Sequence, residues 1–351
     1  MFPDFPLSCP CLLCKVLFRG QYMRLLKIVL VMSFLCVSIP GYSSDLESPR
    51  KVSLVLHWLP QAQFAGYYVA VKKGIYRKYG LDVSIISGGI DKLPEVYLNE
   101  GKADFAVMWL NMGIKARDKG IPLVNVAQIV QRSALMFMAK KNRGIEKVSD
   151  IQGRKVGVWP GLNDEQANLF FKKNGLDVTV VPQYKTVNVF LRDGIDVVSA
   201  MWYNEYHTII NAGYNDDELT RFFLFKHGVN FPEDGIYTLS ETFQAEPQLV
   251  YNFVRASKEG WKYVFQHREE ALRIMVRCMK DAHVPADIMH QRWMLDKIRD
   301  LVDINDSEQL NGVLSRRDYE FVVNALRQNN TINAAPAYTD FYTGCYDDIQ
   351  K

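Results

Sequence analysis

Apolar and polar positions alternate along the body of the chain in a way that predicts repeated strand–helix units. Residues 51–57 are apolar and β-branched at alternate positions, which predicts a buried strand. Trp58 and the two residues after it end this strand, and residues 64–73 then carry apolar side chains at helical spacing before Gly74. The loop between strand and helix lies at the carboxyl end of the strand, where open α/β sheets bind their ligands.

The same alternation continues downstream and turns helical near the C-terminus. Strands are predicted at 81–87, 103–108, 123–129, 134–140, 155–158, 177–181, 197–201 and 221–225, and helices at 92–99, 112–119, 164–173, 187–193, 206–212, 247–266, 268–281 and 286–298. Strands that alternate with helices indicate mostly parallel sheets covered by helices.

Two chain crossings divide these units into two lobes. We place the first crossing between lobes after residue 140, in the polar stretch 141–147, and the return near residues 234–237. The predicted fold is an α/β clamshell of two Rossmann-like lobes joined by two hinge crossings. Its expected parts are 44–140 with 237–330 as lobe 1 and its C-terminal helices, 141–236 as lobe 2, and 331–351 as a tail.

The N-terminus has the pattern of an export signal. Residues 23–27 contain Arg24 and Lys27 and form a basic start, 28–39 are an apolar run, and small residues precede a cut after residue 43. We therefore expect 1–43 to be a signal peptide whose true start is Met23. About a dozen apolar residues are too few to span a bilayer. Lipid attachment at Cys36 is less favoured, because small residues do not precede it. We therefore expect a periplasmic protein.

Composition narrows the class of protein. The chain has 351 residues, 48% of them hydrophobic and 23% charged, as in a globular protein large enough for two lobes. A net charge of +3 without a basic run does not favour nucleic acid as a partner. Outside the N-terminal segment only Cys278 and Cys345 remain, which form one disulfide or stay as two thiols. No metal-binding cluster and no cofactor are predicted.

Tryptophans mark the expected binding surface. Trp58, Trp109, Trp159 and Trp202 each fall within a residue or two of a predicted strand end. An indole stacked on a flat ring contributes about 0.5–1.5 kcal/mol beyond the area that it buries. The alternative is that these side chains fill the cores of the lobes.

Two loops of the second lobe carry polar candidates. Asn204 can donate and accept hydrogen bonds and Glu205 can accept two from an amine; alternatively, Asn204 caps a helix whose first turn contains Glu205. Residues 157–165 form a loop whose backbone N–H groups point into a cleft, with Gly161 and Asn163 as candidates, or a plain turn that Asn163 caps. Its acidic end disfavours a phosphorylated ligand and favours a neutral or cationic one.

The complete set of candidate ligand-binding residues comes from both lobes. It comprises Trp58, Gln61, Gln63, Phe64, Tyr67, Trp109 and Asn111 in the first, and Trp159, Gly161, Asn163, Trp202, Tyr203, Asn204 and Glu205 in the second. We interpret His57 as a structural residue, because a histidine at a strand end is more often one. No catalytic residue is predicted, since the chain contains neither GxSxG nor HExxH and no Cys–His pair beyond the signal segment.

Four segments also carry a family resemblance. They are WLPQAQFAGYYVAVKKGIYRKYGLDV (58–83), GKADFAVMW (101–109), GVWPGLNDE (157–165) and MWYNEY (201–206). In this order they resemble the thiamine-pyrimidine precursor family of periplasmic solute-binding proteins, within the type-2 group that includes nitrate, sulfonate and taurine receptors. The resemblance covers roughly residues 51 to 300.

The resemblance implies a function. It implies the monomeric substrate-binding component of an ABC importer, which delivers a small pyrimidine-like molecule to a permease in the inner membrane. The implied ligand is a hydroxymethyl- or formylaminopyrimidine, with the Asn204–Glu205 pair facing it and Glu205 recognising its exocyclic amine.

Three alternatives remain. A nitrate, sulfonate or taurine receptor would need convergent Arg or Lys donors, whereas these loops offer carboxylates and aromatic rings. A sensory ectodomain is less favoured, because neither a membrane helix nor a kinase segment follows Lys351. The fungal thiamine-pyrimidine synthases of the same fold family use an iron-binding cysteine run and consume pyridoxal phosphate, and this chain has no such run after Cys36. We therefore expect a binding protein rather than an enzyme.

Overall fold

The computed structural model describes residues 48–89, 91–161, 164–302 and 311–344. The expected signal peptide at 1–43, Asn163 and Cys345 lie outside these ranges, so the signal sequence and the pairing of Cys345 with Cys278 stay predictions. None of the helices in the described ranges combines the length and the apolar character that crossing a membrane requires.

The first lobe is built on a five-stranded sheet in the order β2-β1-β3-β10-β4. Its strands are β1 (Arg50–Leu56), β2 (Leu81–Ile86), β3 (Phe105–Trp109), β4 (Leu123–Gln128) and β10 (Asp234–Leu239). β1 pairs in parallel with β2 and β3, whereas β10 runs antiparallel to both β3 and β4. β3 and β4 are buried throughout, which explains the continuous apolar run of β3; the two polar residues of β4, Asn125 and Gln128, are hydrogen-bonded to each other.

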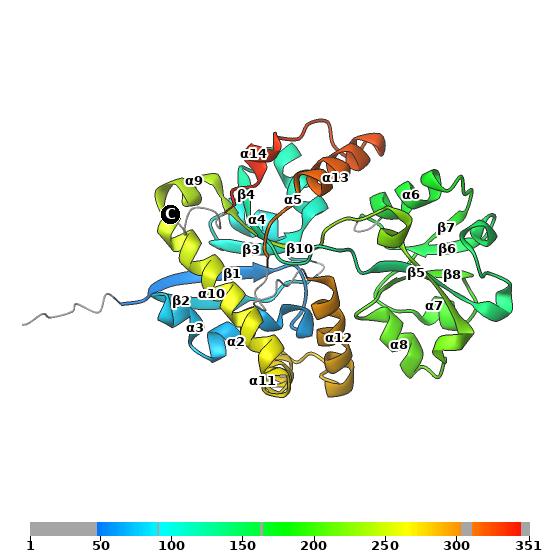
Figure 1. Cartoon of the computed structure of the whole chain (residues 1–351), viewed down its shortest axis with the longest axis horizontal. Coiled ribbons are helices and arrows are strands. Elements are labelled where there is room, and N and C mark those ends of the chain that lie inside the picture. Colours follow the sequence, from blue (N-terminus) through cyan, green and yellow to red (C-terminus); the bar gives the residue numbers. More distant parts are fainter. Residues whose placement is uncertain (1–47, 90, 162–163, 303–310, 345–351) are drawn as a thin grey trace, which may run out of the picture. The chain divides into compact units, whose positions relative to one another are not determined.

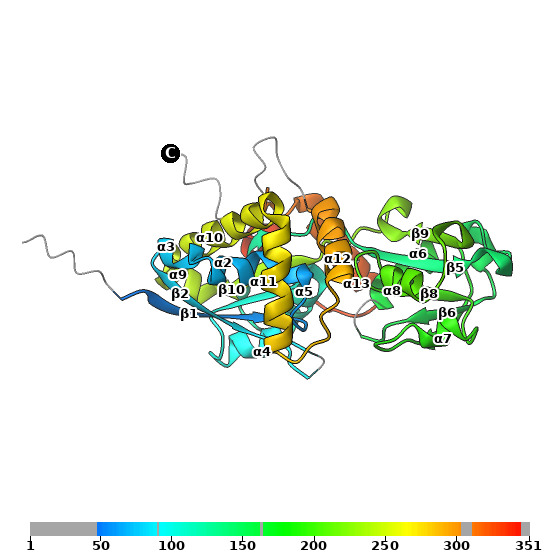
Figure 2. The same cartoon turned by 90° about the horizontal axis from the view of Figure 1, so that it is seen from below.

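Helices cover both faces of this sheet. In chain order they are η1 (Ala62–Phe64), α2 (Ala65–Lys72), α3 (Ile75–Lys78), α4 (Pro94–Asn99), α5 (Leu110–Asp118), α9 (Ser240–Ala245), α10 (Pro247–Gln266), α11 (Arg268–Asp281), α12 (Ile288–Leu301), α13 (Arg316–Gln328) and α14 (Tyr338–Phe341). Figure 2 shows α2, α3 and α10 on one face and α4 on the other. α2 and α10 approach closely at Gly66, where an added Cβ would lie 2.4 Å from the Trp261 indole.

The second lobe has its own five-stranded sheet, in the order β7-β6-β8-β5-β9 (Figure 1). Its strands are β5 (Leu135–Lys140), β6 (Lys155–Val158), β7 (Thr179–Pro182), β8 (Val197–Met201) and β9 (Leu219–Phe223). Its helices are η2 (Lys141–Arg143), η3 (Val148–Ile151), α6 (Asp164–Lys173), α7 (Asn188–Leu191), α8 (Glu205–Asn211), η4 (Asp216–Glu218) and η5 (Leu224–His227). β6 pairs in parallel with β7 and β8, and β5 runs antiparallel to β8 and β9.

The first crossing between the sheets comes before β5, not after it as the sequence predicted. β5 pairs with β8 and β9, so residues 135–140 belong to the second lobe. All six of its residues are buried, and an apolar run of this kind does not indicate which sheet it joins. The polar stretch 141–147 that we interpreted as the linker begins with η2 at the far end of β5. The return crossing likewise ends before Asp234, since β10 begins there.

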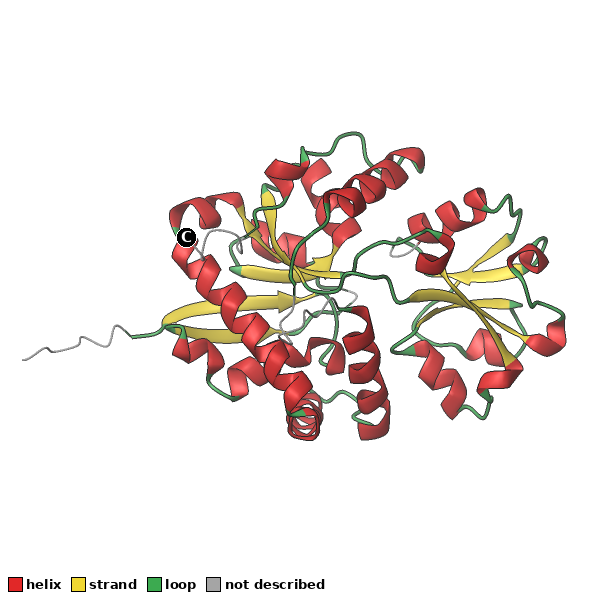
Figure 3. Ribbon diagram, viewed as in Figure 1, coloured by secondary structure: helices red, strands yellow, loops and turns green. Residues whose placement is uncertain are grey.

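The two crossings run beside each other and are bonded together. The backbone N–H of Glu233 donates to the Val130 carbonyl at 3.1 Å, and that of Val130 donates to the Asp234 carbonyl at 3.0 Å. Figure 3 shows the two segments passing between the sheets. Four of the five strands in each sheet run in the same direction, and the reversed one, β5 or β10, is the strand that directly follows a crossing.

Candidate functional site

A buried network of polar side chains holds the loop that follows β1. His57 Nε2 lies 2.9 Å from Asp234 Oδ1, and Gln63 Nε2 donates to Asp234 Oδ2 at 3.0 Å. Gln61 Nε2 in turn donates to Gln63 Oε1 at 2.6 Å. These bonds tie the predicted binding loop to the first residue of β10 and satisfy polar groups that burial would otherwise make costly. His57 is thus hydrogen-bonded within the first lobe.

The aromatic candidates next to this network divide into core and partly open positions. Phe64 is fully buried and meets His57 edge-on at 5.2 Å between ring centroids. Tyr67 is also fully buried and packs against Trp261 at 5.9 Å, between α2 and α10. Trp58 remains only partly buried. The structure therefore places Phe64 and Tyr67 in the packing of the first lobe and leaves Trp58 as the more accessible ring.

A small pocket of about 10 Å³, room for about one water molecule, joins both lobes and the return crossing. Its lining residues are Trp109, Asn111, Gln166, Phe231, Pro232 and Glu233. Trp109 ends β3, Asn111 lies in the first turn of α5, and Gln166 comes from α6. These six described residues comprise two aromatic, two amide, one proline and one carboxyl side chain, with neither Arg nor Lys.

Trp109 brings an unused hydrogen-bond donor to this pocket. Its side chain is 7% exposed, and its indole Nε1 has no hydrogen-bond partner among the described residues. A buried N–H without a partner costs about 1–3 kcal/mol, so such groups are rare unless something else satisfies them. A ligand acceptor that enters the pocket would do so.

Glu233 is the carboxyl group of the pocket. Its Oε1 accepts from the Ala134 backbone N–H at 2.5 Å and from Ser133 Oγ at 3.3 Å, while its Oε2 is 3.4 Å from the Tyr203 hydroxyl. Burial raises the pKa of Glu233 well above its usual value, and the neighbouring Asp234 carboxylate raises it further. Burial likewise raises the pKa of Tyr203.

An ion pair connects the helices on either side of the pocket. Lys115 Nζ of α5 lies 2.7 Å from Glu165 Oε1 of α6 and donates to the Gly161 carbonyl at 3.4 Å. Burial raises the pKa of Glu165, and the Lys115 ammonium opposes this shift. The exposed Gly161, at φ +72°, has the left-handed conformation that suits glycine in this tight loop.

Glu205 and Asn204 lie at the start of α8. Glu205 Oε2 accepts from the Met201 backbone N–H at 2.9 Å, and its Oε1 accepts from Asn204 Nδ2 at 2.8 Å. Burial raises the pKa of Glu205 to about 7. Asn204 holds the N-cap position, but within the described residues its side chain makes no cap hydrogen bond. Both oxygens of Glu205 are thus bonded inside its own turn.

Helix α12 contacts both lobes, and the sequence did not predict these contacts. His290 Nε2 lies 2.9 Å from Asn204 Oδ1, and Trp293 Nε1 donates to the Trp202 carbonyl at 2.9 Å. His290 Nδ1 is also 3.0 Å from His207 Nδ1, and Gln291 Oε1 accepts from the Ala62 backbone N–H at 2.7 Å. α12 therefore contacts the binding loop of the first lobe as well as the 202–207 segment of the second.

The remaining tryptophan of the predicted set lies within the second lobe. Trp159 is partly buried and its Nε1 donates to the Tyr184 carbonyl at 3.1 Å. Of the four tryptophans, only Trp109 is a lining residue of the described pocket, and Trp58, Trp159 and Trp202 keep part of their rings accessible.

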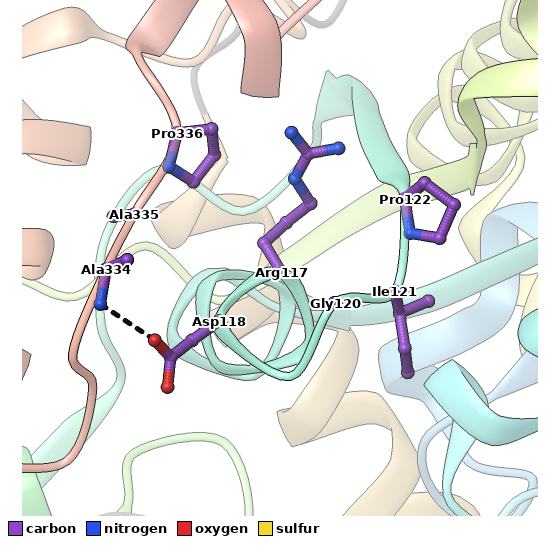
Figure 4. A pocket seen from close by; sticks show the side chains of 8 residues that line it. All are labelled: Arg117, Asp118, Gly120, Ile121, Pro122, Ala334, Ala335 and Pro336. Carbon is purple, nitrogen blue, oxygen red and sulfur yellow. Dashed lines mark hydrogen bonds between the residues drawn. The ribbon is translucent and has the colours of Figure 1, made fainter.

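A larger surface hollow lies at the opposite end of α5 (Figure 4). Arg117 and Asp118 border it together with the turn at 120–122 and residues 334–336. Asp118 Oδ1 accepts the backbone N–H groups of Asn333 and Ala334 at 3.0 and 2.8 Å. This carboxylate thus attaches the C-terminal segment to the first lobe, whereas Asn111, seven residues earlier on α5, lines the pocket between the lobes.

Sequence reasoning missed Glu233, Gln166 and the contacts of α12. A signal existed for Glu233: the pair Glu233-Asp234 interrupts an apolar segment directly before a strand. Acidic residues are rarely buried unless they have a structural or binding role. For α12 no comparable signal exists, because only the folded chain brings it to the 202–207 segment.

A family model described as NMT1/THI5 like matches residues 61–271. The chain belongs to the NMT1/THI5-like family. The matched region runs from the loop after β1 through the whole second lobe and into α11, so it includes every residue of the pocket. The resemblance predicted from the four sequence segments is confirmed.

Relatives within this family include binding proteins. The formylaminopyrimidine-binding protein of Halalkalibacterium halodurans is 25% identical over 272 residues, which are 75% of this chain and 81% of that protein. The riboflavin-binding protein RibY of Chloroflexus aurantiacus is 26% identical over 258 residues, covering 71% and 72%. Other relatives are named as 4-amino-5-hydroxymethyl-2-methylpyrimidine phosphate synthases.

Solved structures show the same fold. The periplasmic aliphatic sulphonate binding protein SsuA from Escherichia coli matches with a TM-score of 0.64 at 14% identity, over 84% of this chain and 92% of that one. At this identity the likeness establishes the fold alone. The predicted type-2 periplasmic-binding-protein clamshell is therefore confirmed for this NMT1/THI5-like chain.

Proposed function

We propose that this NMT1/THI5-like protein is the solute-binding component of an ABC importer, and that its solute is a thiamine-pyrimidine precursor or a similar small nitrogen heterocycle. The observation that carries the proposal is the pocket between the lobes, which offers aromatic, amide and carboxyl side chains without Arg or Lys among its described lining. Such a lining favours a flat, neutral or cationic molecule with amine donors.

The chemistry of the pocket disfavours an oxyanion. Nitrate or a sulfonate is bound most strongly by cationic donors, which the described lining lacks, and the buried Glu233 carboxyl would face it instead. Lys115, on the same helix as Asn111, is paired with Glu165. The fold that this protein shares with SsuA therefore does not imply that the two proteins bind the same class of ligand.

Closure of the lobes explains how such a protein would work. A ligand that contacts Trp109 in one lobe and Gln166 in the other stabilises the joined arrangement of the lobes. In this proposal the permease of the inner membrane recognises that joined form, and the protein acts as a monomer in the periplasm.

We propose binding rather than catalysis. His57, whose ring centroid lies 5.4 Å from that of Trp109, contacts Asp234 and Gln63 inside the first lobe and is not among the pocket's lining residues. The synthases among the relatives make the distinction worth testing, because the same panel of pyrimidines can be assayed for turnover as well as for binding.

The test is a thermal-shift screen of residues 44–351. The panel contains thiamine, hydroxymethyl- and formylaminopyrimidines, riboflavin, nitrate, taurine and an alkyl sulfonate. A ligand at 100 times its dissociation constant adds about 2.7 kcal/mol of stability, which a melting curve detects readily. A shift with aminopyrimidines supports the proposal. A shift with an anion alone, or with no compound, overturns it.

A further inference from the structure

Helix α12 is anchored on the first lobe and on the first crossing. Gln291 Oε1 accepts from the backbone N–H of Ala62 in the loop after β1, at 2.7 Å. At the end of the helix, the Leu301 carbonyl accepts from the backbone N–H of Gln131, at 3.3 Å. The helix therefore moves with the first lobe.

The first half of α12 also holds the second lobe, at and just before α8. Trp293 Nε1 donates to the Trp202 carbonyl at 2.9 Å, and the Trp293 ring stacks on that of His207 with 5.2 Å between centroids. His290 Nε2 lies 2.9 Å from Asn204 Oδ1. Figures 1 and 2 both show α12 beside α8. Separation of the lobes has to break these contacts.

The two histidines of this interface face each other through their ring nitrogens. His290 Nδ1 lies 3.0 Å from His207 Nδ1, and Asn211 Nδ2 lies 3.1 Å from the same His207 atom. Asn204 Nδ2 donates to Glu205 Oε1, so its oxygen faces His290, whose Nε2 then carries a hydrogen. Any further proton on His290 goes to Nδ1. One hydrogen fits between two nitrogens at 3.0 Å, whereas two protonated rings bring two N–H groups together there.

We propose that α12 is a latch between the lobes and that protonation of both His207 and His290 releases it. Acid then favours separated lobes, in which water reaches both imidazolium rings. A further consequence rests on the proposed function: because the solute needs both lobes, its affinity falls as the surroundings acidify.

The surroundings of the two rings give the direction of this effect. Burial lowers the pKa values of His207 and His290, and the contact with His207 lowers that of His290 further. Separation uncovers the rings and returns their pKa values toward about 6.5. Protons therefore bind more readily to the separated form below that pH. Each histidine that has to stay neutral makes joining about 30-fold less favourable at pH 5.0.

The charged neighbours of the pair do not cancel this effect. Asp287 raises both pKa values, but by less than burial lowers them. Lys297 adds a positive charge on α12, Arg292 of α12 is paired with Glu269 of α11, and η1 contains no charged residue. Glu205 acts in the opposite sense, since burial raises its pKa to about 7. Both of its printed hydrogen bonds are made inside the second lobe, so they persist when the lobes separate.

The first test needs no ligand. Small-angle scattering measures the radius of gyration of the purified protein from pH 7.5 down to 5.0, over the range in which far-UV circular dichroism stays unchanged. The wild type should expand below about pH 6.5. His290→Gln should not expand, because glutamine keeps a donor for Asn204 Oδ1 and carries no charge. His283→Asn, which removes an exposed imidazole between α11 and α12, is the control and should expand like the wild type.

Either of two results overturns the inference: a wild type that does not expand, or a His290→Gln variant that expands equally. His207→Gln removes the other ring, from the second lobe, and should behave like His290→Gln. It keeps the test decisive if His290→Gln does not fold.

Calorimetry with the pyrimidine found in the screen tests the consequence for binding. Between pH 7.5 and 5.0 the dissociation constant of the wild type should rise at least tenfold more than that of His290→Gln. The same ligand is used for both proteins, so its own titration cancels. An equal rise in both overturns the coupling between latch and solute. Expansion without binding of any pyrimidine would support the latch and refute the proposed function.

Discussion

The Lys115–Glu165 ion pair connects the first lobe to the second, and Lys115→Met would remove the charge while keeping most of the side-chain volume. The pair is 2.7 Å long, with side-chain exposures of 19% for Lys115 and 6% for Glu165. At an effective dielectric constant of 20, two unit charges at this separation attract by about 6 kcal/mol. Desolvation of both groups and the ordering of the lysine side chain offset most of this.

The net contribution is of the order measured for charge-assisted hydrogen bonds, about 2 kcal/mol. That free energy corresponds to about 30-fold in the equilibrium between joined and separated lobes. Because the ligand is proposed to need both lobes, its dissociation constant should rise by up to about 30-fold in the variant. Titration calorimetry with the pyrimidine found in the screen measures this directly.

A double-mutant cycle with Glu165→Gln identifies the cause. If the ion pair acts as described, the double variant should bind no more weakly than Lys115→Met alone, since the interaction is already lost. An unchanged dissociation constant in Lys115→Met would refute the reasoning, as would fully additive effects of the two substitutions.

Two further predictions concern stability. Burial lowers the pKa values of His207 and His290, and the contact with His207 lowers that of His290 further. Below about pH 6.5 the unfolded chain therefore binds more protons than the folded one, so the free energy of unfolding should fall as the pH drops through that range. His290→Gln should reduce the change in unfolding free energy between pH 5.5 and 7.5, measured in urea melts. The comparison with wild type is needed because the raised pKa of Glu205 acts in the opposite direction. An identical pH dependence in the two proteins would contradict the role given to His290. Gly66→Ala should destabilise by about 1–3 kcal/mol in urea, because its Cβ would overlap the Trp261 indole, whereas helix propensity alone would give a gain. A more stable variant would show that α2 and α10 can separate without cost.

Much of the fold could be predicted because its elements have strong local patterns. β6, α6, β8, α10 and α11 have the predicted bounds, each being an apolar or amphipathic segment with turn residues at its ends. The bounds of α13 were not predicted, although the side chain of Ser315 caps this helix. The sequence after residue 298 was interpreted only as helical, without separate helices being placed in it. The sheet to which β5 belongs could not be read from the sequence, since strand pairing is decided by contacts distant in the chain.

The candidate site was predictable in part for the same reason. Tryptophans and polar residues at strand ends mark which edge of a sheet binds, and Trp109 and Asn111 do line the pocket. Which atoms of those residues remain available depends on neighbours such as Ala134 and Tyr203, which only the folded chain reveals. Glu205 illustrates this: its residue type suits an amine, and only the folded chain shows that each of its oxygens already accepts one hydrogen bond within its own turn.

The reversed strand of the first sheet has a consequence for how the chain acquires its structure during synthesis. β4 joins its sheet only through β10, and β10 begins at Asp234, more than a hundred residues after the end of β4. The second lobe uses only strands between residues 135 and 223. A growing chain can therefore finish the lobe that is encoded second before the lobe that is encoded first. Until residue 239 has been added, β3 has an unpaired edge and β4 lacks its strand partner, so the chain is exposed to misassembly and to chaperones at this stage.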